Sequence, residues 1–191
     1  MLFRSDWDQA YNEGRDYTLI NVFFLKKLLK DLNINEGFKI LDYGCGTGDM
    51  SRKLADIGMN VMATDFSEEA IKIAKEKSLD EKYLSSIEYK VWGTNQIEGK
   101  YDMIILKLVL AFIPDKFKFL EKLKTYLNQN GKIIVITPVT YRDEESVSKD
   151  RAIGIEREVF IEKATPIFKN VESYHVDYLS NYSQTETFVC E

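Results

Sequence analysis

The sequence predicts an α/β fold, a three-layer sandwich in which helices cover both faces of a seven-stranded, mostly parallel sheet. Segments with helical and strand spacing alternate along the 191 residues, which is typical of parallel strands joined by helices. The last two expected strands are separated only by Ser180–Gln184, a connection that suits a hairpin, so the last strand should be antiparallel. No linker divides residues 1–191, so we expect a single domain.

Seven short apolar runs are the expected strands. The run Tyr101–Leu106 is apolar towards both faces, as expected of a parallel strand that is buried on both sides. The seven runs are Lys39–Tyr43, Asn60–Asp65, Ile87–Trp92, Tyr101–Leu106, Lys132–Thr137, Asn170–Leu179 and Thr185–Cys190.

Apolar residues at helical spacing place the first two core helices. One is expected over Tyr17–Leu32, with Asp16 as its N-cap. The other carries an apolar stripe from Met50 to Ile57 and ends at Gly58, because glycine readily adopts the left-handed conformation that closes a helix.

Capping residues and a turn place the remaining helices. Ser67 is the expected N-cap of one helix, whose acidic first turn complements the helix dipole. Asp115 caps the next, whose apolar stripe reaches Leu127, and Asn130–Gly131 then turns the chain into a strand. The last helix is expected over about Ile155–Phe168.

Charge and composition argue against several classes of protein. Asp and Glu number 31 against 26 Lys and Arg, a formal net charge of −5 without a basic stripe, so we expect no nucleic-acid partner. No apolar run is long enough to span a bilayer, and the acidic N-terminal segment does not resemble a secretory signal. Two cysteines, Cys45 and Cys190, do not make a disulfide framework, so the expected location is the cytoplasm. The oligomeric state is not predicted.

The most informative segment is a glycine-rich turn between the first strand and the next helix. Asp42 precedes three glycines at alternate positions, Gly44, Gly46 and Gly48. Glycine lets the backbone approach a ligand closely, and such a turn in an open parallel sheet is the usual place for a cofactor. A dinucleotide site would need a glycine where Asp49 stands, and this carboxylate would repel a pyrophosphate. The pattern therefore favours a cofactor other than a dinucleotide.

This turn closely resembles the first motif of the class I S-adenosylmethionine-dependent methyltransferases. Four later segments resemble further motifs of that family in the same order, so the resemblance covers roughly Lys39–Pro138. The four segments are Val61–Ser67, Tyr101–Ile105, Leu108–Asp115 and Leu127–Val135. The resemblance implies a Rossmann-like fold, S-adenosylmethionine as cofactor, and an enzyme that transfers its methyl group by in-line displacement.

Asp65 is the expected ligand of the cofactor's ribose, because a carboxylate at the tip of the second strand can accept hydrogen bonds from both hydroxyls. Phe66 would then lie against the adenine. The resemblance implies that Asp42 fixes the loop and the aminoacyl end. The full set of expected cofactor residues is Asp42, Gly44, Cys45, Gly46, Gly48, Asp65, Phe66, Trp92, Gly93, Thr94 and Lys107.

Two segments depart from the family pattern. Where the family has an acidic residue after the third strand, this chain has Trp92, Gly93 and Thr94, so either Thr94 or the ring of Trp92 is expected to contact the adenine. Where many members that act on small molecules carry paired histidines, it has Ala111 and Phe112, which excludes a mechanism that needs histidine there. The sequence identifies no catalytic residue and no metal site.

The expected acceptor of the methyl group is a small molecule, because the chain is short and has no inserted lid domain. Tyr11, Tyr17 and Tyr141 are candidates to line its pocket, and segments 1–16 and 139–154 are candidates to cover it. Two alternatives stay open. One is a regulatory module that binds adenosylmethionine without catalysis, and the other is an NAD-dependent oxidoreductase on a similar sheet.

Overall fold

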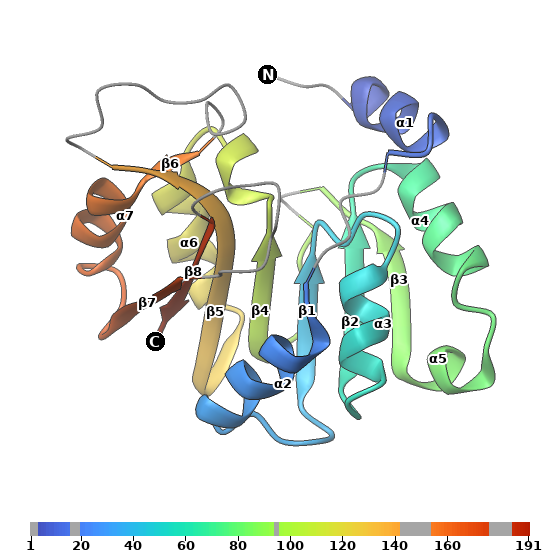
Figure 1. The fold of residues 1–191 in the computed structure, drawn as a ribbon, viewed down its shortest axis with the longest axis horizontal. Helices are drawn as coiled ribbons and strands as arrows, with labels where there is room; N and C mark the ends of the chain where they lie inside the picture. Colours follow the sequence, from blue (N-terminus) through green and yellow to red (C-terminus); the bar gives the residue numbers. More distant parts are fainter. Residues whose placement is uncertain (1–3, 16–19, 94–95, 142–153, 176–184) are drawn as a thin grey trace.

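One sheet forms the centre of the computed structural model, which describes residues 4–15, 20–93, 96–141, 154–175 and 185–191 (Figure 1). Its strands follow the order β3-β2-β1-β4-β5-β8-β7, and a further strand, β6, pairs with β5. The strands are β1 (Lys39–Tyr43), β2 (Asn60–Asp65), β3 (Ile87–Val91), β4 (Tyr101–Lys107), β5 (Leu127–Thr140), β6 (Ile155–Glu156), β7 (Val171–His175) and β8 (Thr185–Cys190).

Helices surround the sheet. They are α1 (Arg4–Asn12), α2 (Val22–Asp31), α3 (Asp49–Ala55), α4 (Glu68–Glu76), α5 (Glu81–Ser86), the 3-10 helix η1 (Leu110–Phe112), α6 (Lys116–Lys124) and α7 (Arg157–Ala164). Helices α2 and α3 pack on one face of the sheet, and α6 and α7 pack on the other (Figure 1). Neighbouring side chains of β1 alternate between these two cores, with Ile40 on the α2 side and Leu41 on the α6 side.

The direction of the strands confirms the predicted fold class. Pairing is parallel along β3, β2, β1, β4 and β5, and β8 runs antiparallel to both β5 and β7. The seven predicted strands form the continuous path of the sheet. The two-residue β6, which the sequence analysis did not predict, is an eighth strand beside β5.

Most strand boundaries agree with the sequence prediction. β1, β2 and β8 have the predicted bounds, β3 ends one residue earlier, at Val91, and β4 extends one residue further, to Lys107. The described part of β7 ends at His175, and the predicted remainder of that strand and the connection to β8 lie outside the described residues. Antiparallel pairing of β7 with β8 agrees with the predicted hairpin.

The prediction for the start of α2 was wrong. The helix begins at Val22, and its N-cap is Asn21, whose side chain accepts a hydrogen bond from the Phe23 amide at 2.8 Å. The predicted cap, Asp16, lies outside the described residues. Gly58 closes α3 as predicted: its amide and that of Met59 bond back to the last turn of the helix, and its φ is +89°.

β5 is longer than predicted, since the expected turn at Asn130–Gly131 is a bulge within the strand. Leu127, expected in the stripe of α6, is the first residue of β5 and pairs with Tyr101. The pairing with β4 shifts before Met103, and Asn130 adopts a φ of +64°. Asn130 thus keeps the left-handed backbone expected of a turn, but the strand starts earlier than predicted because β4 pairs with the chain on both sides of these residues.

The last helix is shorter than the predicted Ile155–Phe168. Ile155 and Glu156 pair with the end of β5 as β6, so their backbone is extended and α7 starts at Arg157. Phe168 packs into the α6 side of the core beyond the end of α7. α5 and η1 are short helices for which the sequence analysis made no prediction.

The carboxyl ends of β1, β2 and β4 meet at one edge of the sheet because these strands are parallel. Tyr43 leads from that edge into the glycine-rich turn, Asp65 is the last residue of β2, and Lys107 is the last residue of β4. This edge is therefore the place where the predicted site residues can meet. Within the described part of the chain, no helix is long and apolar enough to cross a membrane.

Candidate functional site

The turn Gly44–Gly48, called the glycine loop below, needs glycine at three positions. The φ angles of Gly44, Gly46 and Gly48 are +76°, +54° and +82°, in the left-handed region that other residues rarely adopt. Space is also short, because a Cβ at Gly44 would lie 2.3 Å from Cγ2 of Val109. The loop is thus packed closely against the segment that follows β4.

Hydrogen bonds tie the glycine loop to the end of β2. The amides of Gly44 and Cys45 both donate to the Thr64 carbonyl, at 2.7 and 2.9 Å. The Gly46 amide donates to Oδ2 of Asp65 at 2.9 Å. The loop is therefore held in place by the strand whose tip was predicted to bind the ribose.

Asp65 is 5% exposed, and both of its carboxylate oxygens accept backbone hydrogen bonds. Oδ1 accepts from the Ser67 amide at 2.9 Å, and Oδ2 accepts from Gly46. Burial raises the pKa of Asp65, and these hydrogen bonds act in the opposite direction. The Phe66 amide also lowers the pKa through a backbone hydrogen bond, and a carboxylate has about four acceptor positions, so Asp65 keeps some capacity to accept from a hydroxyl.

Asp42 lies beneath the loop and is 1% exposed. The Ser51 hydroxyl of α3 donates to its Oδ2 at 2.6 Å. Burial raises the pKa of Asp42 to about 6, against the lowering effects of the Ser51 hydrogen bond and the positive charge of Lys107. Asp65 and Asp49 also raise it, because they bring like charge close to the same carboxyl group.

α1 lies at the same edge of the sheet, beside α4 (Figure 1). Three of its residues contact three separate parts of the site. A Cβ on Gly46 would lie 3.0 Å from the Tyr11 hydroxyl, the Ser67 hydroxyl donates to Asp8, and the rings of Trp7 and Phe112 meet edge to face, 5.2 Å between centroids. α1 therefore joins the glycine loop, the start of α4 and η1.

The residues present fit an adenosyl cofactor with an amino-acid tail. Gly44 and Gly46 are partly exposed, while Thr47 and Gly48 are buried, so the loop presents its first two glycines to a ligand. Asp65 at the adjacent strand tip can accept hydrogen bonds from hydroxyl groups. Its negative charge also suits a ligand that carries a cationic sulfur.

Several of the expected cofactor residues meet at this edge. Phe66 follows Asp65 and is partly exposed, and Lys107 is close enough to Asp42 to lower its pKa. Cys45 is buried, and burial raises the pKa of its thiol well above its usual value, so it is a neutral thiol rather than a nucleophile. Among the residues that the structure describes, no group of His, Cys, Asp and Glu is placed to hold a metal ion.

Trp92 and Gly93 directly follow β3, at the same edge of the sheet as Asp65. Trp92 is 7% exposed and packs in the core on the α6 side, while its amide donates to the Asp65 carbonyl at 2.9 Å. The Gly93 amide donates to the Gln96 side chain at 2.7 Å. Thr94 and Tyr17 lie outside the described residues.

Tyr141 belongs to a different polar cluster, at the end of β5. Its hydroxyl donates to Glu186 at 3.2 Å, and Nε of Arg157 donates to both oxygens of the same carboxylate at 2.9 Å. Arg157 also donates to the Ser173 hydroxyl at 2.7 Å. Tyr141 is thus hydrogen-bonded to Glu186 of β8, the same carboxylate that Arg157 of α7 binds.

Asp8, Ser51 and Val109 contact the site but were not predicted from the sequence. Asp8 had a detectable signal, because Arg4, Asp8 and Tyr11 recur at helical spacing on one side of α1. Ser51 and Val109 had none, since only the fold brings them to Asp42 and Gly44.

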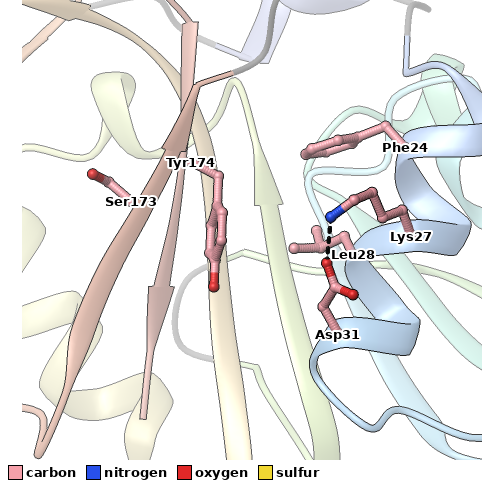
Figure 2. A pocket seen from close by; sticks show the side chains of 6 residues that line it. All are labelled: Phe24, Lys27, Leu28, Asp31, Ser173 and Tyr174. Atoms are coloured by element: carbon pink, nitrogen blue, oxygen red, sulfur yellow. Dashed lines mark hydrogen bonds and ion pairs between the residues drawn. The ribbon is translucent and has the colours of Figure 1, made fainter.

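A groove of about 430 Å³ lies between α2 and β7, away from the glycine loop (Figure 2). Within it, Lys27 and Asp31 form an ion pair at 2.6 Å, and Tyr174 lies opposite them. Its lining consists of Phe24, Lys27, Leu28, Asp31, Ser173 and Tyr174. None of the expected cofactor residues lines this groove, so it is not the candidate site.

Comparison with known proteins identifies the family. Residues 34–175 match the family described as “Methyltransferase domain”. The mitochondrial ubiquinone biosynthesis O-methyltransferase of Schizosaccharomyces pombe is 30% identical over 136 residues, which are 69% of this chain and 49% of that protein. The demethylmenaquinone methyltransferase of Staphylococcus saprophyticus is 26% identical over 115 residues, 58% of this chain and 49% of that protein. The chain thus spans about half the length of these curated relatives.

Among solved structures, the chain is similar to the magnesium protoporphyrin IX methyltransferase of Synechocystis with bound S-adenosylhomocysteine. The TM-score is 0.74 at 17% identity, and the match covers 99% of this chain and 96% of that one. Because the identity is only 17%, this structural similarity is evidence for the fold and not for the activity.

Proposed function

The chain belongs to the class I S-adenosylmethionine-dependent methyltransferases, and from this premise we propose that it transfers the methyl group of S-adenosylmethionine to a small-molecule acceptor. The observation that carries the proposal is the glycine loop, which Gly46 ties to Asp65 at the tip of the next strand. Relatives named for ubiquinone biosynthesis and for demethylmenaquinone support a small acceptor. We do not propose a nucleic acid as acceptor, because the net charge of −5 would repel its phosphates.

In this proposal the chain holds the two ends of the cofactor separately. Asp65 accepts hydrogen bonds from the ribose hydroxyls, and the glycine loop, with Asp42 beneath it, receives the aminoacyl end. When bound, the cofactor supplies a methyl group on a positively charged sulfur. The remaining task of the protein is to align the acceptor with that methyl group and to keep water away.

Binding and transfer assays test this function. In calorimetry we expect heat of binding from S-adenosylmethionine and S-adenosylhomocysteine and none from NAD. Release of S-adenosylhomocysteine in the presence of phenols, amines or thiols would then identify the acceptor class. Tight binding of NAD alone would contradict the proposal, and cofactor binding without transfer to any acceptor would favour a regulatory module.

We also propose that α1 covers the acceptor side of the site, because Tyr11, Asp8 and Trp7 contact three parts of the carboxyl edge. Removal of residues 1–16 should leave a folded protein that binds the cofactor but transfers methyl groups at least tenfold more slowly, since water then reaches the methyl group. The measurements are far-UV circular dichroism, calorimetry and turnover with one acceptor.

A point variant on the same helix provides the control for this truncation. Arg4→Ala removes only an exposed ion pair with Glu68, which contributes little, so turnover should be unchanged. Full activity of the truncated protein would refute the covering role. Loss of folding would instead show that α1 is part of the core. Residues 142–153 of the other candidate segment, 139–154, lie outside the described residues.

We also propose that the protein is located in the cytoplasm, and the two cysteines, Cys45 and Cys190, support this location. Both are free and buried thiols. Burial raises the pKa of both thiols, that of Cys190 to about 12, so neither thiol is readily oxidised or exchanged. Such thiols are compatible with a reducing compartment.

A further inference from the structure

A polar network adjoins the glycine loop at Thr47 and Gly48. Nη1 of Arg52, in α3, donates to the Thr47 carbonyl at 2.9 Å and to the Ser78 hydroxyl at 3.4 Å. The Ser78 and Tyr89 hydroxyls share a hydrogen bond of 2.9 Å. α3, the segment just after α4, and β3 therefore all contribute to one network that reaches the backbone of the loop.

The network occupies the space that a side chain at position 48 would need. A Cβ on Gly48 would lie 2.6 Å from the Tyr89 hydroxyl and 2.9 Å from Nη1 of Arg52. Thr47 and Ser78 are 4% and 3% exposed, so this contact is shielded from water. A hydrogen bond from a charged donor to a shielded carbonyl is among the stronger ones in a protein.

The loop therefore has two anchors, which hold different residues of it. Thr64 and Asp65 hold its first three residues, and Arg52 holds Thr47. Glycine-rich backbone has many accessible conformations, so each anchor removes freedom that the ligand would otherwise have to remove on binding. The anchor at Asp65 does not depend on Arg52, so loss of Arg52 should affect one end of the loop more than the other.

We propose that Arg52 is a positioning residue for the aminoacyl end of the cofactor, and that it acts through the Thr47 carbonyl. This inference rests on the proposed function, in which the glycine loop receives the aminoacyl end and Asp65 the ribose. Arg52 itself need not touch the ligand. Its role is to hold Thr47 and Gly48 in the conformation that presents Gly46 to the ligand.

Two ligands that differ only at the aminoacyl end test the proposal. S-adenosylhomocysteine has this end, and methylthioadenosine keeps the adenosine and the sulfur but lacks it. Arg52→Met should weaken the calorimetric affinity for S-adenosylhomocysteine about tenfold or more and that for methylthioadenosine less than twofold. Arg52→Lys, which keeps the charge but loses the planar donor set, should give a smaller loss in the same direction. Amide exchange at Gly46–Asp49 should be faster in Arg52→Met.

Lys72→Met is the matched control, because Lys72 is a cation on α4 whose ion pair with Glu69 is exposed on the surface. It should leave both affinities unchanged. Equal losses for both ligands in Arg52→Met and Arg52→Lys, or no loss in either, would overturn the positioning role. If the unaltered protein binds neither ligand, the proposed function itself fails, so the two failures are distinguishable.

Discussion

Asp65→Ala should weaken the affinity for S-adenosylhomocysteine about ten- to a hundredfold. Each hydrogen bond to a charged group contributes about 1.5–3 kcal/mol, and about 1.4 kcal/mol corresponds to a factor of ten in affinity. The substitution removes the proposed acceptor of the ribose hydroxyls. It also leaves the amides of Gly46 and Ser67 without the partner that they have here, so the loop should be less ordered. Calorimetry and hydrogen exchange at Gly44–Gly48 measure the two effects.

Asp102 offers a matched control for Asp65. It also accepts two hydrogen bonds, from the Lys39 amide at 2.8 Å and the Asn128 side chain at 2.7 Å, but it lies at the opposite edge of the sheet. Asp102→Ala should therefore lower the melting temperature without changing cofactor affinity. An unchanged affinity in Asp65→Ala would mean that the ribose is held by other residues.

Asp42→Asn should stabilise the ligand-free protein at neutral pH. The folded-state pKa of Asp42 is raised from 3.8 to about 6 by burial, so the folded protein holds this proton more tightly than the unfolded chain. Stability from this group is therefore lost as pH rises from about 4 to about 6, and the loss is complete above that range. A shift of this size corresponds to about 2–3 kcal/mol, which the uncharged amide avoids while it can still accept from Ser51.

Denaturant unfolding at several pH values checks this prediction. The difference in unfolding free energy between Asp42→Asn and the unaltered protein should be near zero at about pH 4, grow up to about pH 6 and then stay constant. Ser51→Ala is the companion variant: it removes the hydrogen bond that lowers the pKa of Asp42, so its own pH dependence should extend to higher pH. A difference that does not vary with pH would contradict a raised pKa.

Cofactor affinity should rise with pH, whereas the stability contributed by Asp42 falls. A cationic cofactor favours the ionised form of Asp42, so the affinity of the unaltered protein should rise with pH through about 6. Asp42→Asn should bind more weakly at pH 8 and show less of this dependence. The pH dependence of stability and that of affinity would together show that the buried charge of Asp42 lowers the stability of the free protein and strengthens cofactor binding.

The sequence by itself determined the features that depend on neighbouring residues. The bounds of β1 and β2, the Ser67 cap of α4 and the closure of α3 at Gly58 all follow from apolar runs and from residues with particular backbone preferences. The short connection between the last two strands was enough to predict an antiparallel end to the sheet. Asp65 ends an apolar run, which predicted that it lies at a strand tip. A parallel sheet puts all such tips at one edge, so Asp65 was expected beside the glycine loop.

Only the tertiary structure decided which distant segments surround the glycine loop. Val109 packs on Gly44, Tyr11 lies over Gly46, and Tyr89 fills the space beside Gly48. The length of β5 was also decided by its partners, since pairing with β4 turned an expected loop into a bulge. The physical reason is the same in each case: local preferences favour a conformation by small free energies, whereas close packing and hydrogen bonds with residues far along the chain choose among the conformations that remain.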